Sequence, residues 1–267
     1  MNTVTRGPVG RAVVNGLLTL AIVLALWWAV VNLTGMSPYV AKGPAQVWDF
    51  LVAGEDAAEN RAVLAPLLAR TLLDAALGFV VGMGVAGGLA VAFSLSRTVE
   101  AGVMPLALLL RSIPLVSIAP VIILVTGRGT QASVAVIGSL VVLFPALASI
   151  LFGLSRASAQ SLDLVHVYGG NRLTAMRKVN VPGALPSLFA AARVSVPGAV
   201  TGALLAEWLS TGTGIGGSIV KFTASARFDD LWASVALITV VTLLLYNFVQ
   251  VIENLVLTRM AMTTAQG

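Results

Sequence analysis

Residues 155–185 read SRASAQSLDLVHVYGGNRLTAMRKVNVPGAL, and this stretch decides how the whole chain is interpreted. It is too polar to cross a bilayer and too long for a simple turn. We predict a first short helix over 157–168, ended by the glycine pair 169–170, because glycine commonly follows the last helical turn. A second helix is predicted over 172–179, stopping before Pro182, since the residue before proline avoids helical geometry. This helix–glycine–helix unit is either a docking element for a partner or a solvated loop with ordinary caps.

Long apolar runs lie on both sides of this stretch. Of the 267 residues, 58% are apolar and 10% are charged, against about 45–50% and about 25% in an average soluble domain. So few charges cannot cover a soluble surface, and intrinsic disorder requires low hydrophobicity. A bilayer crossing needs roughly 20 apolar residues, which leaves room for about six helices. We therefore predict one all-α integral membrane domain over residues 1–267, with spans at about 13–33, 71–95, 103–125, 132–154, 187–209 and 231–251.

The first apolar run is interpreted as a retained helix rather than a signal peptide. It is long enough to span, and no clear small-x-small cleavage site follows it before Pro38. An inside start and six spans place both termini and the 155–185 loop in the cytoplasm. The formal charge of +5 suits a membrane protein with basic cytoplasmic loops. Because the basic residues are scattered rather than clustered on one face, we expect no nucleic-acid partner.

The chain lacks the motifs of nucleotide, metal or hydrolytic chemistry. A P-loop needs Gly-Lys-Ser or Gly-Lys-Thr, and none of Lys42, Lys178 and Lys221 follows a glycine. His166 is the single histidine and there is no cysteine, so we predict no metal site and expect His166 to make an interfacial contact. Paired-Asp, His-Glu-x-x-His and Gly-x-Ser-x-Gly patterns are also missing from the sequence. We therefore expect a non-catalytic protein that holds no cofactor of its own.

A few ionisable residues lie within or beside the predicted spans. Such a group is costly at membrane depth and usually faces a cavity or a partner. The candidates are Arg111, Arg193 and Glu207, and Arg193 is expected to pair with the cytoplasmic loop. Proton-coupled transport requires buried acids, for which only Asp74 and Glu207 are plausible.

Glycines mark two further features. The spacings Gly78-xxx-Gly82 and Gly84-xxx-Gly88 predict a smooth strip for close helix packing. The Gly-, Ser- and Thr-rich residues 210–230 predict flexibility at the outer mouth of a pathway. A plain loop beside a satisfied Glu207 is the alternative at that place.

Three groups of residues together resemble one known family. They are Asp163-Leu164-Val165 with Gly169 and Val179-Asn180-Val181-Pro182; Leu110-Arg111-Ser112-Ile113-Pro114; and Leu205-Ala206-Glu207-Trp208-Leu209 with Gly212-Thr213-Gly214-Ile215-Gly216. From Val13 to Leu257 the chain resembles the binding-protein-dependent ABC importer permeases (type I importer membrane subunits), closest to the nitrate, sulfonate and taurine permeases. The family's loop signature is Glu-Ala-Ala, three residues, Gly, nine residues, Ile-x-Leu-Pro. Here Asp163 replaces the Glu, and Leu164 and Val165 replace the two Ala, so the acid is kept while the bulk rises.

This resemblance implies the permease subunit of an ATP-driven importer in a bacterial cytoplasmic (inner) membrane. It implies a pathway formed by two copies of the chain, two ATPase subunits that hold ATP and Mg, and a periplasmic or lipid-anchored solute-binding protein. The solute is expected to be small, either nitrate-, sulfonate- or taurine-like or a vitamin precursor. The residues assigned to ATPase coupling are Asp163, Leu164, Val165, His166, Gly169, Gly170, Arg172, Val181 and Pro182. The candidates for the pathway and its gate are Arg111, Pro114, Glu207, Gly212, Gly214 and Gly216.

Two other interpretations remain open. A self-sufficient secondary transporter or channel needs inverted repeats or broken helices with buried ionisable groups, and the sequence has no clear internal repeat. A membrane scaffold protein explains a docking loop but leaves the Gly-rich outer segment without a role.

Overall fold

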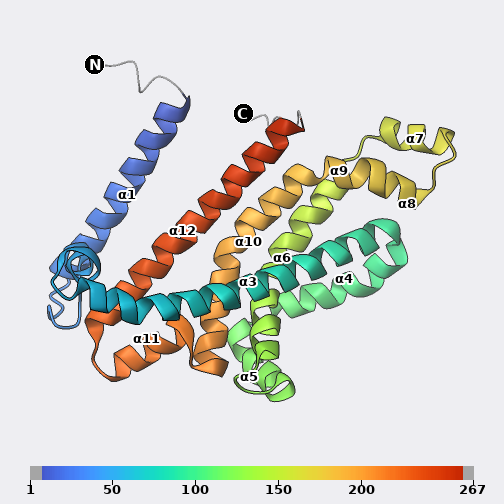
Figure 1. The fold of residues 1–267 in the computed structure, drawn as a ribbon. Helices are drawn as coiled ribbons and strands as arrows, with labels where there is room; N and C mark the ends of the chain where they lie inside the picture. Colours follow the sequence, from blue (N-terminus) through green and yellow to red (C-terminus); the bar gives the residue numbers. More distant parts are fainter. Residues whose placement is uncertain (1–7, 261–267) are drawn as a thin grey trace. The chain divides into compact units, whose positions relative to one another are not determined.

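The computed structural model describes residues 8–260, with side chains from residue 18 onward. The predicted cytoplasmic location of the two termini rests on residues 1–7 and 261–267, which lie outside the described residues. Between residues 8 and 260 every regular element is an α- or π-helix (Figure 1). This confirms the predicted all-α class.

Several of these helices are long and apolar enough to cross a bilayer. Within the described chain, four helices qualify: α3 (Ala57–Leu95), α6 (Gln131–Leu154), α10 (Leu185–Ala206) continued by the π-helical η4 (Glu207–Thr211), and α12 (Phe228–Arg259). The bent pair α4 (Arg97–Ser112) and α5 (Leu115–Thr126) counts as a fifth crossing if it is taken as one span. In α1 (Pro8–Leu33), the residues with described side chains, Leu18–Leu33, form an apolar helix that is shorter than the other four.

The third predicted span, 103–125, is wrong as a single straight helix. α4 and α5 meet at an angle of 109°. The chain turns at Ile113, which has extended backbone angles (φ −80°, ψ 124°) because Pro114 disfavours helical geometry in the residue before it. Pro105 and Pro120 nevertheless lie inside α4 and α5. The break therefore occurs at one proline of the three.

The second predicted span also differs at its start. α3 begins at Ala57 rather than near residue 71, and its 39 residues extend over ~58 Å at the usual helical rise. That length is about twice the hydrocarbon thickness of a bilayer, so α3 is too long to lie wholly within it along the normal. The preceding polar segment holds a short helix, α2 (Pro44–Trp48), followed directly by the π-helical η2 (Asp49–Ala53).

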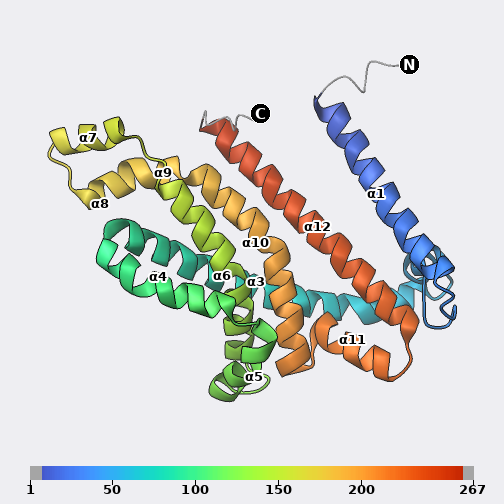
Figure 2. The ribbon, with the colours of Figure 1, turned by 180° about the vertical axis from the view of Figure 1, so that it is seen from behind.

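The chain divides into two compact units. The first comprises residues 1–65 and 221–236, and the second comprises residues 66–220 and 237–267. Both central helices of the second unit, α6 and α10, lie side by side in the two views (Figures 1 and 2).

Aromatic and ionic contacts hold the first unit together. The rings of Trp27 and Trp232 stack with their centroids 5.9 Å apart. Their indole N–H groups donate to the carbonyl oxygens of Lys42, at 3.1 Å, and Val40, at 2.9 Å. The ammonium group of Lys42 also lies 3.1 Å from the Asp229 carboxylate. These contacts fix the end of α1 and the segment after it against the start of α12.

Glycines bring three helices of the second unit into close contact. Gly138 of α6 lies between Gly78 of α3 and Gly202 of α10. A Cβ atom added to Gly78 would lie 2.9 Å from the Cα of Gly138, and one added to Gly202 would lie 2.8 Å from it. Backbones at this distance leave no room for a side chain. The predicted packing role is thus confirmed for Gly78, and for Gly82, where a Cβ would meet Val142.

The second predicted glycine strip has no such neighbour among the described residues. A Cβ atom on Gly84 or Gly88 would meet no described atom of another element within 4 Å. These two glycines therefore do not pack against another helix in the described part of the chain.

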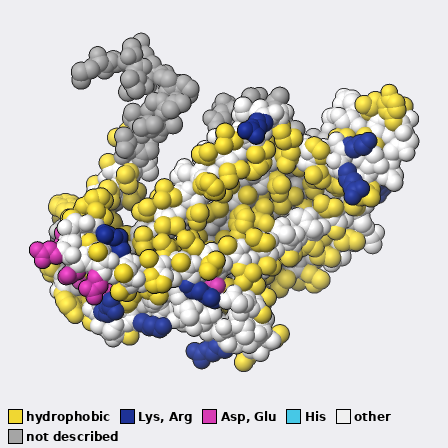
Figure 3. Space-filling view, in the orientation of Figure 1, with side chains coloured by type: hydrophobic (Ala, Val, Ile, Leu, Met, Phe, Trp, Pro, Cys, Tyr) yellow, Lys and Arg dark blue, Asp and Glu magenta, His cyan; other side chains and the backbone are white. Residues whose placement is uncertain are grey.

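Apolar side chains cover much of the outside of the long helices. Figure 3 shows them gathered over α10 and α12. On α12, Leu243, Leu244, Phe248 and Val251 are each more than half exposed. A surface of this kind matches the lipid-facing side of a membrane helix, whose backbone groups are satisfied internally.

Candidate functional site

The polar stretch after α6 folds into short helices. They are α7 (Ala159–Val167), α8 (Arg172–Ala175), the π-helical η3 (Met176–Asn180) and α9 (Val181–Gly183). The hydroxyl of Ser158 caps α7 by accepting a hydrogen bond from the Ser161 N–H at 3.2 Å. The side chain of Asn171 caps α8 in the same way, accepting from the Thr174 N–H at 2.9 Å. The unit projects from the shared end of α6 and α10 in both views (Figures 1 and 2).

The turn between α7 and α8 depends on the predicted glycine pair. Gly169 has a positive φ of 76°, a conformation that glycine adopts without steric cost. The N–H of Gly170 donates to the Val165 carbonyl oxygen at 2.8 Å, and a Cβ on Gly170 would collide with the side chain of Val165. The first predicted helix and its glycine stop are confirmed.

The second predicted helix does not stop before Pro182. Val181 keeps helical angles (φ −65°, ψ −48°), and the chain continues through α9 almost directly into α10. Proline is tolerated in the first turn of a helix, where its missing N–H has no partner to lose. The π-helical η3 ends just before α9, so Pro182 lies in the first turn of a new helical segment instead of interrupting one.

α7 and α8 present an unusual exposed surface. Val167 is 82% exposed and Tyr168 is 83% exposed. The polar side chains of Asp163, His166 and Arg172 are exposed beside them, and none of the three forms an ion pair or a side-chain hydrogen bond within residues 18–260. Exposed apolar groups rimmed by polar side chains are typical of a protein–protein contact.

This exposed unit is firmly joined to the helices behind it. The side-chain amide of Asn180 donates to the carbonyl oxygen of Leu154, the last residue of α6, at 2.9 Å. Met176 and Ala184 are buried in the core cluster that α6 and α10 share. The α7–α8 segment is thus joined to both α6 and α10.

Glu207 forms a second polar site, deep in the molecule. It is the first residue of η4 and is completely buried. Its Oε2 accepts hydrogen bonds from the Thr71 hydroxyl at 2.9 Å and from the Gly216 N–H at 2.8 Å. The Thr71 hydroxyl in turn accepts from the Ile215 N–H at 2.8 Å. Glu207 and Thr71 thus link α3, η4 and the first turn of α11 (Gly214–Ala224). The positive end of the α11 dipole also favours a carboxylate at this place.

The prediction of a flexible Gly-rich segment is wrong where α11 forms. A Cβ on Gly214 would collide with the Glu207 carboxylate, and one on Gly216 would collide with the Leu204 carbonyl. The glycines therefore let α11 close tightly over Glu207, whose Oε2 accepts two hydrogen bonds while its buried Oε1 has no hydrogen-bond partner among the described residues.

Thr71 was not predicted as a site residue. A threonine hydroxyl inside a helix usually bonds to its own backbone, and the Thr71 hydroxyl also lies 3.2 Å from the Leu67 carbonyl oxygen, which competes with Glu207 for its one proton. The one available signal was its position three residues before Asp74 in an otherwise apolar stretch.

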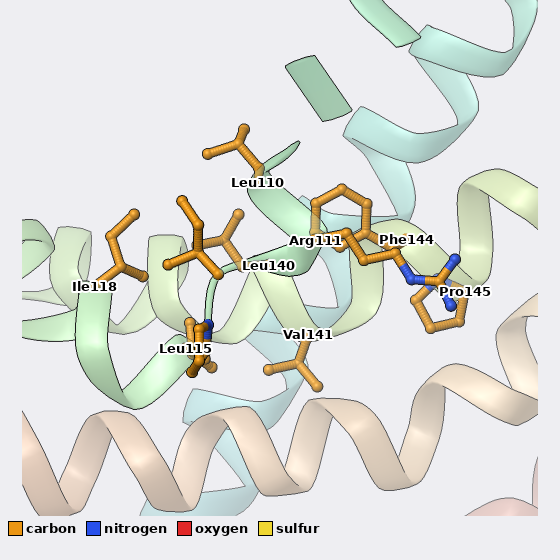
Figure 4. A pocket seen from close by; sticks show the side chains of 10 residues that line it. Leu110, Arg111, Leu115, Ile118, Leu140, Val141, Phe144 and Pro145 are labelled. Atoms are coloured by element: carbon orange, nitrogen blue, oxygen red, sulfur yellow. The ribbon is translucent and has the colours of Figure 1, made fainter. Parts of the chain in front are cut away.

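A cavity of about 380 Å³ lies at the break between α4 and α5. Figure 4 shows the side chain of Arg111 among the apolar side chains that line it. Pro114 lines the same cavity, so these two predicted pathway residues are brought together, whereas Glu207 is not part of its lining.

The prediction that Arg193 pairs with the cytoplasmic loop is wrong. Its guanidinium lies 3.2 Å from the Glu253 carboxylate of α12 and 5.7 Å from the centre of the Tyr246 ring. Because the loop continues straight into α10, Arg193 lies about two turns inside that helix, on the side that meets α12.

Long apolar helices, an exposed helical loop and a cavity at a broken helix together define a membrane-embedded helical protein. Residues 84–262 match the family described as binding-protein-dependent transport system inner membrane component, and the chain belongs to this family. The protein is thus the permease type of subunit found in ABC importers.

Named relatives agree with this assignment. A probable ABC transporter permease protein of Haemophilus influenzae is 28% identical, covering 86% of this chain and 91% of the relative. The riboflavin transport system permease protein RibX of Chloroflexus aurantiacus is 29% identical, covering 89% and 87%. The taurine transport system permease protein TauC of Escherichia coli is 27% identical, covering 90% and 87%.

Proposed function

We propose that this chain forms half of the translocation pathway of an ATP-driven importer in a bacterial cytoplasmic membrane. Its six crossings would be α1, α3, the α4–α5 pair, α6, α10 and α12, with both termini in the cytoplasm. A second copy would complete the pathway. Gly84 and Gly88 support this step, because a glycine strip with no neighbour among the described residues suits close approach of another helix.

The exposed α7–α8 unit carries the proposal of ATPase coupling. Two copies of a separate ATPase subunit, which would hold ATP and Mg, would each grip one such unit. Val167 and Tyr168 would fill a groove of the ATPase, with Asp163 and Arg172 at its rim. This chain would supply no catalytic group and no cofactor.

Movement would then pass from the loop to the pathway. Closure of the ATPase pair on ATP would push the two loops together, and the Asn180–Leu154 hydrogen bond would carry the displacement into α6. α10 would move with it, because η3 and α9 lead directly into that helix. At its far end the Glu207 contact with Gly216 would act as a latch for α11, which opens when a solute-binding protein delivers its solute. Release of ADP and phosphate would restore the inward-facing state.

The proposed solute is a small molecule, either a taurine-like or sulfonate-like compound or a vitamin precursor. The names of the taurine and riboflavin permeases support this range. The binding protein would select the solute in the periplasm or at a lipid anchor.

Charge reversal on α7–α8 tests the coupling. The variant with Asp163→Arg and Arg172→Glu should still insert in the membrane but lose ATP-driven uptake and transport-stimulated ATPase activity by at least about tenfold, since two groups of a protein contact change sign. Arg259→Glu, at the end of α12, is the matched control and should keep both activities. Full uptake and full ATPase stimulation in the double variant would exclude the loop as the coupling element.

A secondary transporter is the competing function, and the broken helix beside Arg111 favours it, because such carriers use discontinuous helices with ionisable groups. Proteoliposomes distinguish the two. Uptake that needs ATP and a co-purifying ATPase supports the importer, whereas uptake by the chain alone under a proton gradient supports the carrier.

A further inference from the structure

Two buried carboxylates meet between α3 and η4. Asp74 of α3 is 1% exposed, and Glu207 of η4 is completely buried. Thr71 contacts Glu207 and lies about one helical turn before Asp74, so both residues lie on the same face of α3. The carboxylate of Asp74 is within hydrogen-bond reach of the Glu207 carboxylate. On α3 itself, the guanidinium Nε of Arg70 lies 3.1 Å from Oδ2 of Asp74.

One oxygen of the Glu207 carboxylate lacks a donor. Oε2 accepts hydrogen bonds from the Thr71 hydroxyl and the Gly216 N–H, whereas Oε1 is buried without a hydrogen-bond partner among the described residues. A buried polar atom without a partner retains its full desolvation cost. A proton held between Asp74 and Glu207 supplies a donor at this place, because a protonated carboxyl donates to the carboxylate that faces it.

The charged groups around Glu207 belong to a small set. Arg70 and Asp74, both on α3, are the charged groups close enough to influence it. α5 and α6, which also contact η4, contain no titratable residue. The other charged residues of the neighbouring loop and helices are Arg128, which is exposed, and Arg193 and Lys221, which lie more than one helical turn further along α10 and α11.

The sum of these charges also calls for a proton. With both acids ionised, the single guanidinium of Arg70 faces two carboxylates, and the buried cluster carries a net negative charge. A net charge buried among apolar helices is costly, and two carboxylates that share one site do not both ionise readily. One added proton makes the cluster neutral.

We propose that Asp74 and Glu207 share one proton, and that this proton locks α11 over Glu207. With the proton bound, a neutral hydrogen-bonded cluster joins α3, η4 and α11. When the proton leaves, the two carboxylates repel each other, and Glu207 separates from Gly216. The lock is thus closed in acid and opens more readily in alkali. This inference rests on the proposed function, because it takes the Glu207–Gly216 contact as the latch for α11.

Glu207→Gln imitates the locked form. The amide N–H of the new side chain replaces the shared proton as the donor toward Asp74, and its carbonyl oxygen still accepts from Thr71 and Gly216. Asp74→Asn removes the other acid, and Glu207 alone then balances Arg70. Neither variant needs a proton to be neutral.

Infrared spectroscopy of the chain in a maltoside detergent, which has no carbonyl group, tests for the proton itself. A protonated carboxyl has a C=O stretching band separate from the bands of a carboxylate, and exposed acids have lost their protons at about pH 7. Difference spectra should show this band in the native chain and its loss in Glu207→Gln and in Asp74→Asn. The matched control is Glu55→Gln, which changes an exposed acid and should keep the band.

Thiol labelling tests whether the proton holds α11 closed. The chain has no cysteine and Ile215 is completely buried, so Ile215→Cys gives a unique thiol that a maleimide reaches when α11 opens. At about pH 8.5 this thiol should react at least about tenfold faster with native Glu207 than with Glu207→Gln, because opening becomes easier as the proton is lost. At about pH 6 the two rates should differ by less than about threefold, because the lock is closed in both. Each comparison is made at one pH, where the open thiol has the same reactivity.

Either measurement can overturn the proposal. A missing carboxyl band, or a band that survives in both variants, excludes the shared proton. Equal labelling rates with Glu207 and with Glu207→Gln at alkaline pH exclude the lock. Labelling that changes with the Na⁺ concentration and not with pH assigns the site to a metal cation instead.

These outcomes are independent of the test of the importer itself. No measurement on the shared proton uses an ATPase, so a chain that shows the band and the labelling difference but binds no ATPase loses only the importer assignment. A chain that co-purifies with an ATPase but shows neither loses only the proton lock.

Discussion

At the scale of the residue, Glu207 is a carboxylate without access to solvent. Thr71 and Gly216 donate to it, and Thr71 also satisfies the N–H of Ile215. A buried polar group that loses its partner retains its desolvation cost. Removing one donor from Glu207 should therefore destabilise the fold by more than the net contribution of a single hydrogen bond.

Thr71→Val tests that arrangement. It keeps the shape of the side chain but removes one donor to Glu207 and the acceptor of Ile215, which should destabilise the chain by about 2–3 kcal/mol. Thermal unfolding of the chain in nanodiscs measures the loss. Thr71→Ser retains the hydroxyl and is the control, and equal unfolding temperatures for the two variants would contradict the assigned role.

Substitutions at two glycines can distinguish the cost of backbone strain from the cost of a steric collision. Gly212 and Gly214 have nearly equal positive φ angles of 65° and 63°, but only Gly214 faces Glu207, while a Cβ on Gly212 would meet no atom within 4 Å. Gly212→Ala should cost about 1–2 kcal/mol, the strain of a left-handed residue. Gly214→Ala should cost clearly more and lower the yield of folded protein. Similar unfolding temperatures would show that α11 does not press on Glu207.

At the scale of the element, glycine contacts decide which helices come together. α6 lies between α3 and α10 because Gly138 meets Gly78 on one side and Gly202 on the other. The glycines of α3 one to two turns later have no such partner. The same residue type, at similar spacing, therefore has two different uses along one helix.

Gly138→Leu should prevent the packing of α3, α6 and α10, because either backbone would have to move away from the added side chain. We expect little monodisperse protein in gel filtration after membrane extraction. Gly84→Leu is the matched control and should fold as a single chain. If it also lowers the mass of the assembled complex, the strip faces the second copy. Normal folding of Gly138→Leu would disprove the contact.

At the scale of the whole molecule, an ion pair joins the second half of α12 to the neighbouring helix. The Arg193–Glu253 ion pair links it to α10, with the Glu253 side chain 7% exposed. Removing one member of a buried pair leaves an unpaired charge, at a cost of about 3–5 kcal/mol, while replacing both with apolar residues is often nearly neutral.

Glu253→Gln should therefore lower the unfolding temperature strongly, and the double variant Arg193→Met with Glu253→Leu should recover most of it. Thermal unfolding in the same nanodiscs measures both. If the double variant is less stable than the single one, the pair does more than hold α12 in place.

The sequence by itself determined the class of protein, the positions of most long helices and the α7–α8 unit. Apolar length and a glycine stop are properties of consecutive residues, so α6 and the Gly169 turn were predicted closely. The family features in the Asp163 to Pro182 segment belong to the same kind of local information.

Only the tertiary structure decided which proline breaks a helix, what Arg193 pairs with and why the glycines near Glu207 are present. Pro66, Pro105, Pro120, Pro145 and Pro197 all lie inside helices, while the chain turns before Pro114. A proline or a glycine permits several local conformations at similar cost, and a charge has many possible partners. The choice among them depends on contacts between residues far apart in the sequence, and those contacts exist only in the folded chain.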